Sequence, residues 1–228
     1  LKNSTLNVPN GYGIYFPSSG TLTIDNSVIN AKTMGVQVCA GSLNVTGDKT
    51  AITVTGDGVA KTENDGAIED GAAISIVERT GYKGLTEINV EGGTFTAKGD
   101  NAAVKAYKWE NQTASAFDNS KNVVAVSGGT FSSAVDKSLC AEGYIPTKNA
   151  DGTYGVKEET RGTEARPYTL AELGVMTRAE YAAAQEALGG TMYVAVGNYT
   201  YDKNGVLGNG ERNDTPGPGG HGPGHLLG

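Results

Sequence analysis

The single tryptophan of the chain, Trp109, stands in a polar stretch together with Tyr107 and Glu110. Tyr82 holds a comparable position earlier in the chain. An aromatic ring in a polar loop can stack on the face of a sugar, while neighbouring polar groups bind the sugar's edge. We therefore predict a glycan-binding corner made of Tyr82, Tyr107, Trp109 and Glu110. The alternative is that the tryptophan folds back and seals the structure beneath it.

A second stretch, from about residue 56 to 71, is rich in glycine and acidic residues. Its side chains Asp65, Glu69 and Asp70 supply carboxylate oxygens, and Ca²⁺ takes about six to eight oxygen ligands. Calcium is therefore a candidate ligand of this loop, through those three residues. The alternative is a set of solvated turn carboxylates that bind no metal, and the sequence indicates no other cofactor.

Catalysis by carboxylates must also be considered. Many enzymes that cleave glycosidic bonds use paired carboxylates, and fixed positive groups can stabilise charge that develops in the reaction. Asp25 and Glu91 hold comparable positions in the sequence pattern, but neither has a basic neighbour there. His221 lies between glycines in a Gly/Pro-rich tail without acidic companions. We therefore assign no catalytic residue and keep an enzyme as an alternative.

These residues are embedded in a repeated pattern of short apolar runs. Alternating segments recur at Leu22–Ile24, Leu43–Val45, Ile88–Val90 and Val124–Val126, and turns rich in Gly, Asn, Asp and Thr separate them. Repeats of about 20 residues made of short strands cannot bury their apolar side alone and must stack on their neighbours. The pattern predicts an all-β solenoid, a single-stranded parallel β-helix over about residues 1–143. Parallel crossovers are almost always right-handed, so we expect a right-handed β-helix.

The repeats give way to a different pattern after Gly143. The segment Tyr144–Val156 contains an Asp-Gly turn between two alternating runs, which predicts a hairpin. Such a hairpin would cap the open sheet edges and complete a β-helix domain at residues 1–157. Residues 158–168 are charged and lack apolar periodicity. We predict that they form a linker.

Residues 169–228 are expected to form a helical segment followed by a truncated further β domain. Thr169 with Glu172, and Thr177 with Glu180, have the spacing of capping boxes at helix N-termini. The second helix should end at a Gly-Gly pair, after which an alternating run indicates a strand. The final residues form a Gly/Pro-rich tail whose composition opposes packed structure.

Charge and hydropathy exclude two classes of partner, and the spacing of the cysteines argues against a disulfide. The net charge is −7 and no basic cluster is present, so nucleic acid is excluded as an expected partner. No apolar run is long enough to span a bilayer, so we expect no membrane insertion by these residues. Cys39 and Cys140 fall three repeats apart, roughly 14 Å at about 4.8 Å per strand, beyond the about 7 Å that a disulfide permits. Two free thiols are predicted.

The Gly-Gly-Thr-Phe steps at Gly92–Phe95 and Gly128–Phe131, with the closing segments Leu139–Tyr144 and Asp151–Tyr154, resemble repeat regions of large extracellular proteins of Gram-positive gut bacteria. The resemblance covers about residues 1–156. It implies a right-handed β-helix, display at the cell surface, and adhesion or glycan contact. It supplies no catalytic residue.

We therefore predict a non-catalytic cell-surface adhesion or glycan-binding segment of a larger bacterial extracellular protein. Its partner would be a glycan or another host surface ligand, and its anchor would lie outside these residues. The alternatives are a polysaccharide-degrading β-helix enzyme, either a lyase or a glycoside hydrolase, and a purely structural stalk.

Overall fold

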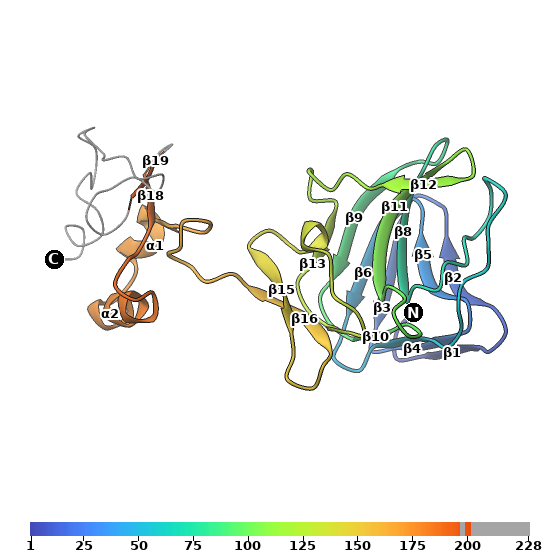
Figure 1. The fold of residues 1–228 in the computed structure, drawn as a ribbon, viewed down its shortest axis with the longest axis horizontal. Coiled ribbons are helices and arrows are strands. Elements are labelled where there is room, and N and C mark those ends of the chain that lie inside the picture. The colour runs from blue at the N-terminus through green and yellow to red at the C-terminus, as the bar shows by residue number, and fades with distance from the viewer. Residues whose placement is uncertain (197–198, 202–228) are drawn as a thin grey trace. The chain divides into compact units, whose positions relative to one another are not determined.

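The computed structural model describes residues 1–196 and 199–201 (Figure 1). The chain separates into two compact units, Leu1–Glu158 and Glu159–Gly228. The Gly/Pro-rich tail and most of the expected further β domain, residues 202–228, lie outside the described residues. The first unit is described throughout and carries the candidate site.

The first unit consists of three sheets in which most strands run parallel. One sheet contains, in spatial order, β1 (Thr5–Val8), β4 (Val28–Ala31), β7 (Ala51–Val54), β10 (Thr94–Thr96), β14 (Thr130–Phe131), β16 (Tyr154–Glu158) and β15 (Tyr144–Lys148). The next contains β12 (Thr113–Ala116), β11 (Val104–Glu110), β8 (Ile74–Arg79), β5 (Met34–Val38) and β2 (Tyr12–Phe16). The last contains β13 (Val124–Val126), β9 (Leu85–Val90), β6 (Gly41–Thr46) and β3 (Thr21–Asp25). From β1 to β11, the chain visits the three sheets in a fixed rotation.

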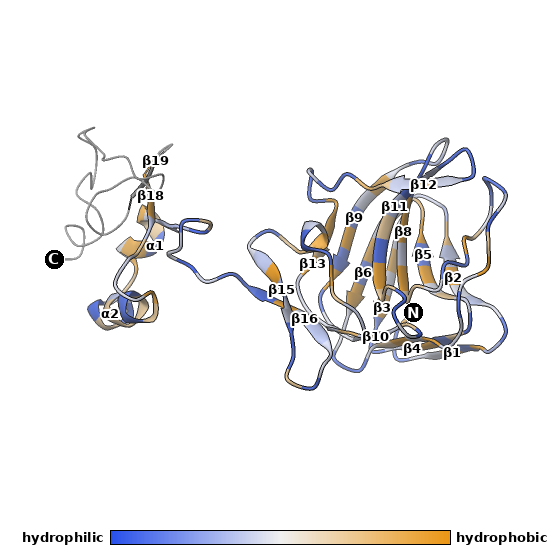
Figure 2. Cartoon of the chain, viewed as in Figure 1, coloured by the Kyte–Doolittle hydropathy of each residue, from blue (hydrophilic) through white to orange (hydrophobic). Residues whose placement is uncertain are grey.

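The parallel register aligns apolar residues of successive strands into ladders. Ile29 pairs with Ile52, Ile52 with Phe95, and Phe95 with Phe131, and all four are buried. The rings of Phe95 and Phe131 stack with centroids 5.2 Å apart. Figure 2 shows the resulting alternation of apolar and polar residues along the strands. Each such side chain contributes about 1.5–3 kcal/mol by burial, so the ladders stabilise the stacking of successive strands.

The Gly-Gly-Thr-Phe steps have a conformational cause. Gly93 and Gly129 have φ of +115° and +109°, where residues with a side chain are strained. A Cβ on Gly93 would also lie 2.9 Å from the ring of Phe95. The glycine therefore permits both the turn and the close packing of the following phenylalanine.

The predicted hairpin is present and covers one sheet edge. β15 and β16 pair antiparallel, and Tyr154 of β16 pairs antiparallel with Phe131 of β14. The other two sheets end differently: β12 pairs antiparallel with β11, and Cys140 forms a bridge with Val126 of β13. Each sheet thus has some covering where its last parallel strand would otherwise be open.

The second unit contains β17 (Tyr168–Thr169), α1 (Leu170–Gly174), α2 (Arg178–Ala187), β18 (Val194–Val196) and β19 (Tyr199–Tyr201). Both predicted capping boxes are present, at the N-termini of α1 and α2. Leu173, Met192 and Val194 form its buried cluster. Within residues 158–168, predicted as a linker, Arg161 forms an ion pair with Glu172 of α1.

Candidate functional site

Strand β11 carries Tyr107 and Trp109, so the prediction that they stand in a polar loop is wrong. The parallel pairing of β11 with β8 continues as far as Trp109 opposite Arg79. The chain then reverses through Asn111 and Gln112, with φ of +52° and +60°, into antiparallel β12. Positive φ at both central residues is typical of a two-residue hairpin turn. The polar stretch therefore extends the sheet by a hairpin.

The acidic, glycine-rich stretch after β7 covers the outward face of the five-stranded sheet. We call residues 55–73, between β7 and β8, the covering loop. Its residue Ile68 is only 4% exposed. The side chain of Gln37 on β5 donates to the carbonyl of Ile68 and accepts from its N–H, both at 2.8 Å. A second buried apolar cluster results, formed by Cys39, Ile68, Val77, Tyr107 and Trp109.

Asp70 attaches the covering loop to the sheet. Its Oδ2 accepts hydrogen bonds from Ser75 Oγ at 2.5 Å and from the Tyr107 hydroxyl at 2.7 Å. Its Oδ1 accepts from the N–H of Ala72 at 3.1 Å. Burial, together with the negative charge of Asp70, raises the pKa of Tyr107 far above its ordinary value. Tyr107 therefore stays protonated and acts as the donor.

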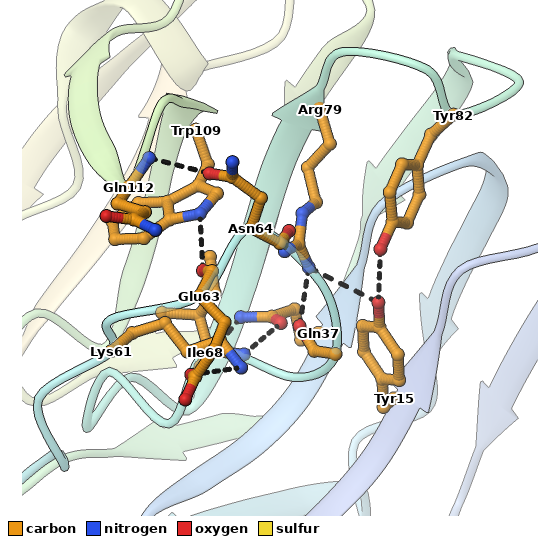
Figure 3. Close-up of polar contacts among 11 residues, drawn as sticks. Tyr15, Gln37, Lys61, Glu63, Asn64, Ile68, Arg79, Tyr82, Trp109 and Gln112 are labelled. Atoms are coloured by element: carbon orange, nitrogen blue, oxygen red, sulfur yellow. Dashed lines mark hydrogen bonds and ion pairs between the residues drawn. The ribbon is translucent and has the colours of Figure 1, made fainter.

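Arg79 holds the other part of the loop. It is 5% exposed, and its Nη1 donates to the carbonyl of Gly66 at 2.6 Å and to the Tyr15 hydroxyl at 3.2 Å. Its Nη2 donates to the carbonyl of Asn64. The guanidinium also lies 4.9 Å from the ring centroid of Tyr82. Figure 3 shows Arg79 with Asn64 on one side and the Tyr15–Tyr82 pair on the other.

Trp109 seals this arrangement. Its side chain is 8% exposed, and its Nε1 donates to the carbonyl of Glu63 at 3.2 Å. The N–H of Gln112 donates to Asn64 Oδ1 at 2.6 Å, so the hairpin turn holds the same part of the loop. Trp109 is consequently no exposed stacking platform; the sealing alternative describes its position. Tyr107, also 8% exposed, lies beneath the loop for the same reason.

A pocket of about 200 Å³ remains between the covering loop and the β11–β12 hairpin. Its lining consists of Asn64, Asp65, Arg79, Thr80, Tyr82, Trp109, Glu110 and Asn111. Three of the four predicted glycan-contact residues, Tyr82, Trp109 and Glu110, therefore meet at one pocket. Sequence reasoning missed Arg79 and Asn64, which are distant from the hairpin in sequence. The signal for Arg79 was its place at the end of an apolar strand, where a buried cation needs acceptors from elsewhere.

The acidic residues of the covering loop do not converge on a metal site. Among the described residues, no group of three or more His, Cys, Asp or Glu side chains could hold an ion. Asp70 is occupied by the contacts above, Glu69 accepts from Thr33 Oγ1 at 2.8 Å, and Asp65 lines the pocket. The structure thus does not assemble the calcium site considered for Asp65, Glu69 and Asp70, because two of them attach the loop to its surroundings.

The carboxylates considered for catalysis remain separate. Asp25 ends β3 and accepts from Thr46 Oγ1 of β6 at 2.8 Å, whereas Glu91 follows β9. β6 lies between β3 and β9 in the sheet. A whole strand therefore stands between the two residues.

The thiols behave as predicted. Cys39 and Cys140 are both free and buried. Burial raises the pKa of Cys39 to about 11, so its thiol is protonated near neutral pH. Since the thiolate is the reactive form, Cys39 acts as an apolar packing residue.

Comparisons of the chain with protein-family models, with curated proteins and with solved structures give no match. Within the part of the chain that the structure describes, no helix is long and apolar enough to cross a membrane.

Proposed function

We propose that this chain is a non-catalytic glycan-binding segment of an extracellular surface protein, and that its first unit is a right-handed single-stranded parallel β-helix. Two observations support the β-helix: the chain rotates through three sheets from β1 to β11, and β1, β4, β7, β10 and β14 pair in parallel within one sheet. The right-handed assignment rests on the strong bias of parallel crossover connections.

The pocket beside Trp109 is the single observation that carries glycan binding. Tyr82 is partly buried, and its aromatic surface can contact the apolar face of one sugar ring. Around it, Asn64, Asp65 and Glu110 are exposed polar groups that can bind sugar hydroxyls. Small-molecule sites commonly combine apolar walls with a few polar groups that fix orientation.

A purely structural stalk is the second candidate. The burial of Tyr107 and Trp109 favours it over a contact surface built on an exposed tryptophan. The glycan proposal accordingly rests on the pocket and not on an exposed ring. The third candidate is a polysaccharide-degrading enzyme, which the experiment below would detect by the oligosaccharides that it releases.

The experiment is a screen of the chain against mucin glycans, pectins and other polysaccharides, with both binding and reducing-end release measured. The proposal expects binding without release. Tyr82→Leu keeps apolar volume but removes the ring, and should weaken the retained ligand about tenfold, the scale of one aromatic contact. Asp48→Ala, an exposed change outside the pocket, is the matched control.

Each other outcome is decisive. Absence of binding to every glycan supports the stalk and contradicts the proposal. Release of oligosaccharides identifies an enzyme. Equal affinity of Tyr82→Leu and Asp48→Ala, with both variants folded, would place the binding surface elsewhere on the chain.

A further inference from the structure

The pocket is lined in part by a buried cation, Arg79, that forms no ion pair with a carboxylate of the described residues. Arg79 lines the pocket and is 5% exposed. Its hydrogen-bond acceptors include the carbonyls of Asn64 and Gly66 and the hydroxyl of Tyr15, which are uncharged. The Cys39 thiol, whose pKa burial raises to about 11, also lies beside Arg79. Within the part of the chain that the structure describes, the Nε of Arg79 has no hydrogen-bond partner. The ion pairs found among residues 1–196 do not include Arg79.

A buried charge without a counter-charge is unfavourable, because neutral acceptors replace only part of the lost hydration. A guanidinium also presents a planar set of donors that matches a carboxylate. An anionic group that reached Arg79 through the pocket would therefore gain more binding free energy than a neutral hydroxyl in the same place. The desolvation of Arg79 occurs when the chain folds, so it does not reduce the free energy of ligand binding.

The acidic side chains of the pocket do not fill this role. Asp65 is exposed, and Glu110 is exposed and lies 3.5 Å from Lys108 Nζ in an ion pair. Both carboxylates are in contact with water, where the high dielectric constant greatly reduces the interaction of two unit charges, so they neither neutralise Arg79 nor repel an inserted anion strongly. Their carboxylate oxygens can accept hydrogen bonds from the hydroxyl groups of a sugar in the pocket.

We infer that the pocket binds a sugar unit that bears a carboxylate, as in a uronic acid, with the carboxylate directed to Arg79. This inference rests on the proposed glycan-binding function and specifies the class of glycan. Tyr82 and Trp109 form the walls against the sugar ring. At the other edge, the amide nitrogen of Asn64 can donate a hydrogen bond, and the carboxylates of Asp65 and Glu110 can accept hydrogen bonds.

Trp109 is the only tryptophan of the chain and lines the pocket, so a change in tryptophan fluorescence when sugar is added arises at this site. The test titrates the native chain with three hexoses of one ring size: glucuronate, glucose and glucosamine. At about pH 6 the first carries a negative charge, the second none, and the third a positive charge. No substitution is needed, so the comparison does not depend on a variant that fails to fold.

Glucuronate should change the emission of Trp109. The glucuronate concentration that gives half of the maximal change should be about tenfold below the corresponding glucose concentration, the scale of one charge-assisted contact. Glucosamine should bind most weakly. Equal affinity for glucuronate and glucose overturns the inference and leaves the glycan-binding proposal standing. Tighter binding of glucosamine overturns it as well, since Asp65 and Glu110 would then determine the charge preference. An unchanged emission with all three sugars overturns it, while the polysaccharide screen decides the proposed function separately.

A variant sharpens the result. Glu110→Gln removes a negative charge at the rim but keeps a side chain of the same shape. The ratio of glucuronate to glucose affinity should rise about twofold, because hydrogen bonds common to both sugars cancel in the ratio. A fall in that ratio would mean that Glu110 assists the anion, and would contradict the placement of the carboxylate at Arg79.

Discussion

The two faces of the five-stranded sheet are stabilised by different means. Its inward face belongs to an apolar core in which Ile14 and Val36, Ile74 and Val104 follow one another in register. Its outward face, which we call the covered face, is buried under the covering loop through hydrogen bonds of Gln37, Asp70 and Arg79. The inner core follows from periodicity, whereas the covered face depends on individual polar contacts between residues far apart in sequence.

The largest effect is expected in the inner core. Phe95→Ala removes a fully buried ring that stacks on Phe131, and should lower the free energy of unfolding by about 3–5 kcal/mol. Urea denaturation followed by far-UV circular dichroism measures it. A loss below about 1 kcal/mol would contradict a continuous core through this ladder.

Trp109→Ala should cost about 3 kcal/mol, because it removes a large buried side chain from the covered face. The covering loop should then open while the sheets remain. We expect rapid proteolysis within residues 55–73 and an unchanged far-UV spectrum. Global loss of β structure would mean that the covered face is part of the inner core and not a separate cluster.

Asp70→Asn should cost about 2 kcal/mol, since it weakens the charge-assisted bonds from Tyr107 and Ser75 without changing the shape of the side chain. A double-mutant cycle with Tyr107→Phe should show coupling, because both changes act on the same Tyr107–Asp70 hydrogen bond. Hydrogen exchange should accelerate in the covering loop only. Additive effects would show that the Tyr107–Asp70 bond contributes nothing to attachment.

The raised pKa of Tyr107 should make the free energy of unfolding depend on pH. Its folded pKa lies above the unfolded value of about 10, so the folded state holds a proton that the unfolded state releases. The contribution is complete below about pH 10 and declines as pH rises, by up to about 1.4 kcal/mol per pH unit. Tyr107→Phe should flatten the alkaline fall in stability between about pH 10 and pH 11. An identical profile in both proteins would contradict the assignment.

The smallest effect is expected at the rim. Lys108 and Glu110 form an exposed ion pair at 3.5 Å, so Glu110→Gln should change the free energy of unfolding by less than about 0.5 kcal/mol. The same variant alters ligand preference in the sugar titration. Stability and binding can therefore be separated at this residue, and a loss above about 1 kcal/mol would show that they cannot.

The sequence predicted the parts of the molecule that depend on local rules. The alternating runs, the hairpin at Asp151-Gly152 and the capping boxes at Thr169 and Thr177 each express geometry within a few residues. Predominantly β structure in parallel sheets follows from the repeated runs in the same way. These features need no knowledge of what lies across the chain.

The candidate site was predictable only in part. Tyr82, Trp109 and Glu110 do line one pocket, but the aromatic ring of Trp109 was expected in solvent because its neighbours in sequence are charged. Its partner, the carbonyl of Glu63, is 46 residues away. No periodicity encodes such a contact. The Asn111–Gln112 turn was the available signal, since an Asn in a short polar stretch between alternating runs is compatible with a hairpin.

The most direct test of a covered face sealed by residues 55–73 is the fluorescence of Trp109 in the native chain. The ring is 8% exposed, so its emission should be blue-shifted and weakly quenched by iodide. Denaturant should shift the emission to the red and make it quenchable. A native emission that is already red-shifted and freely quenched would show that the covering loop does not seal this face, and would remove the pocket built upon it.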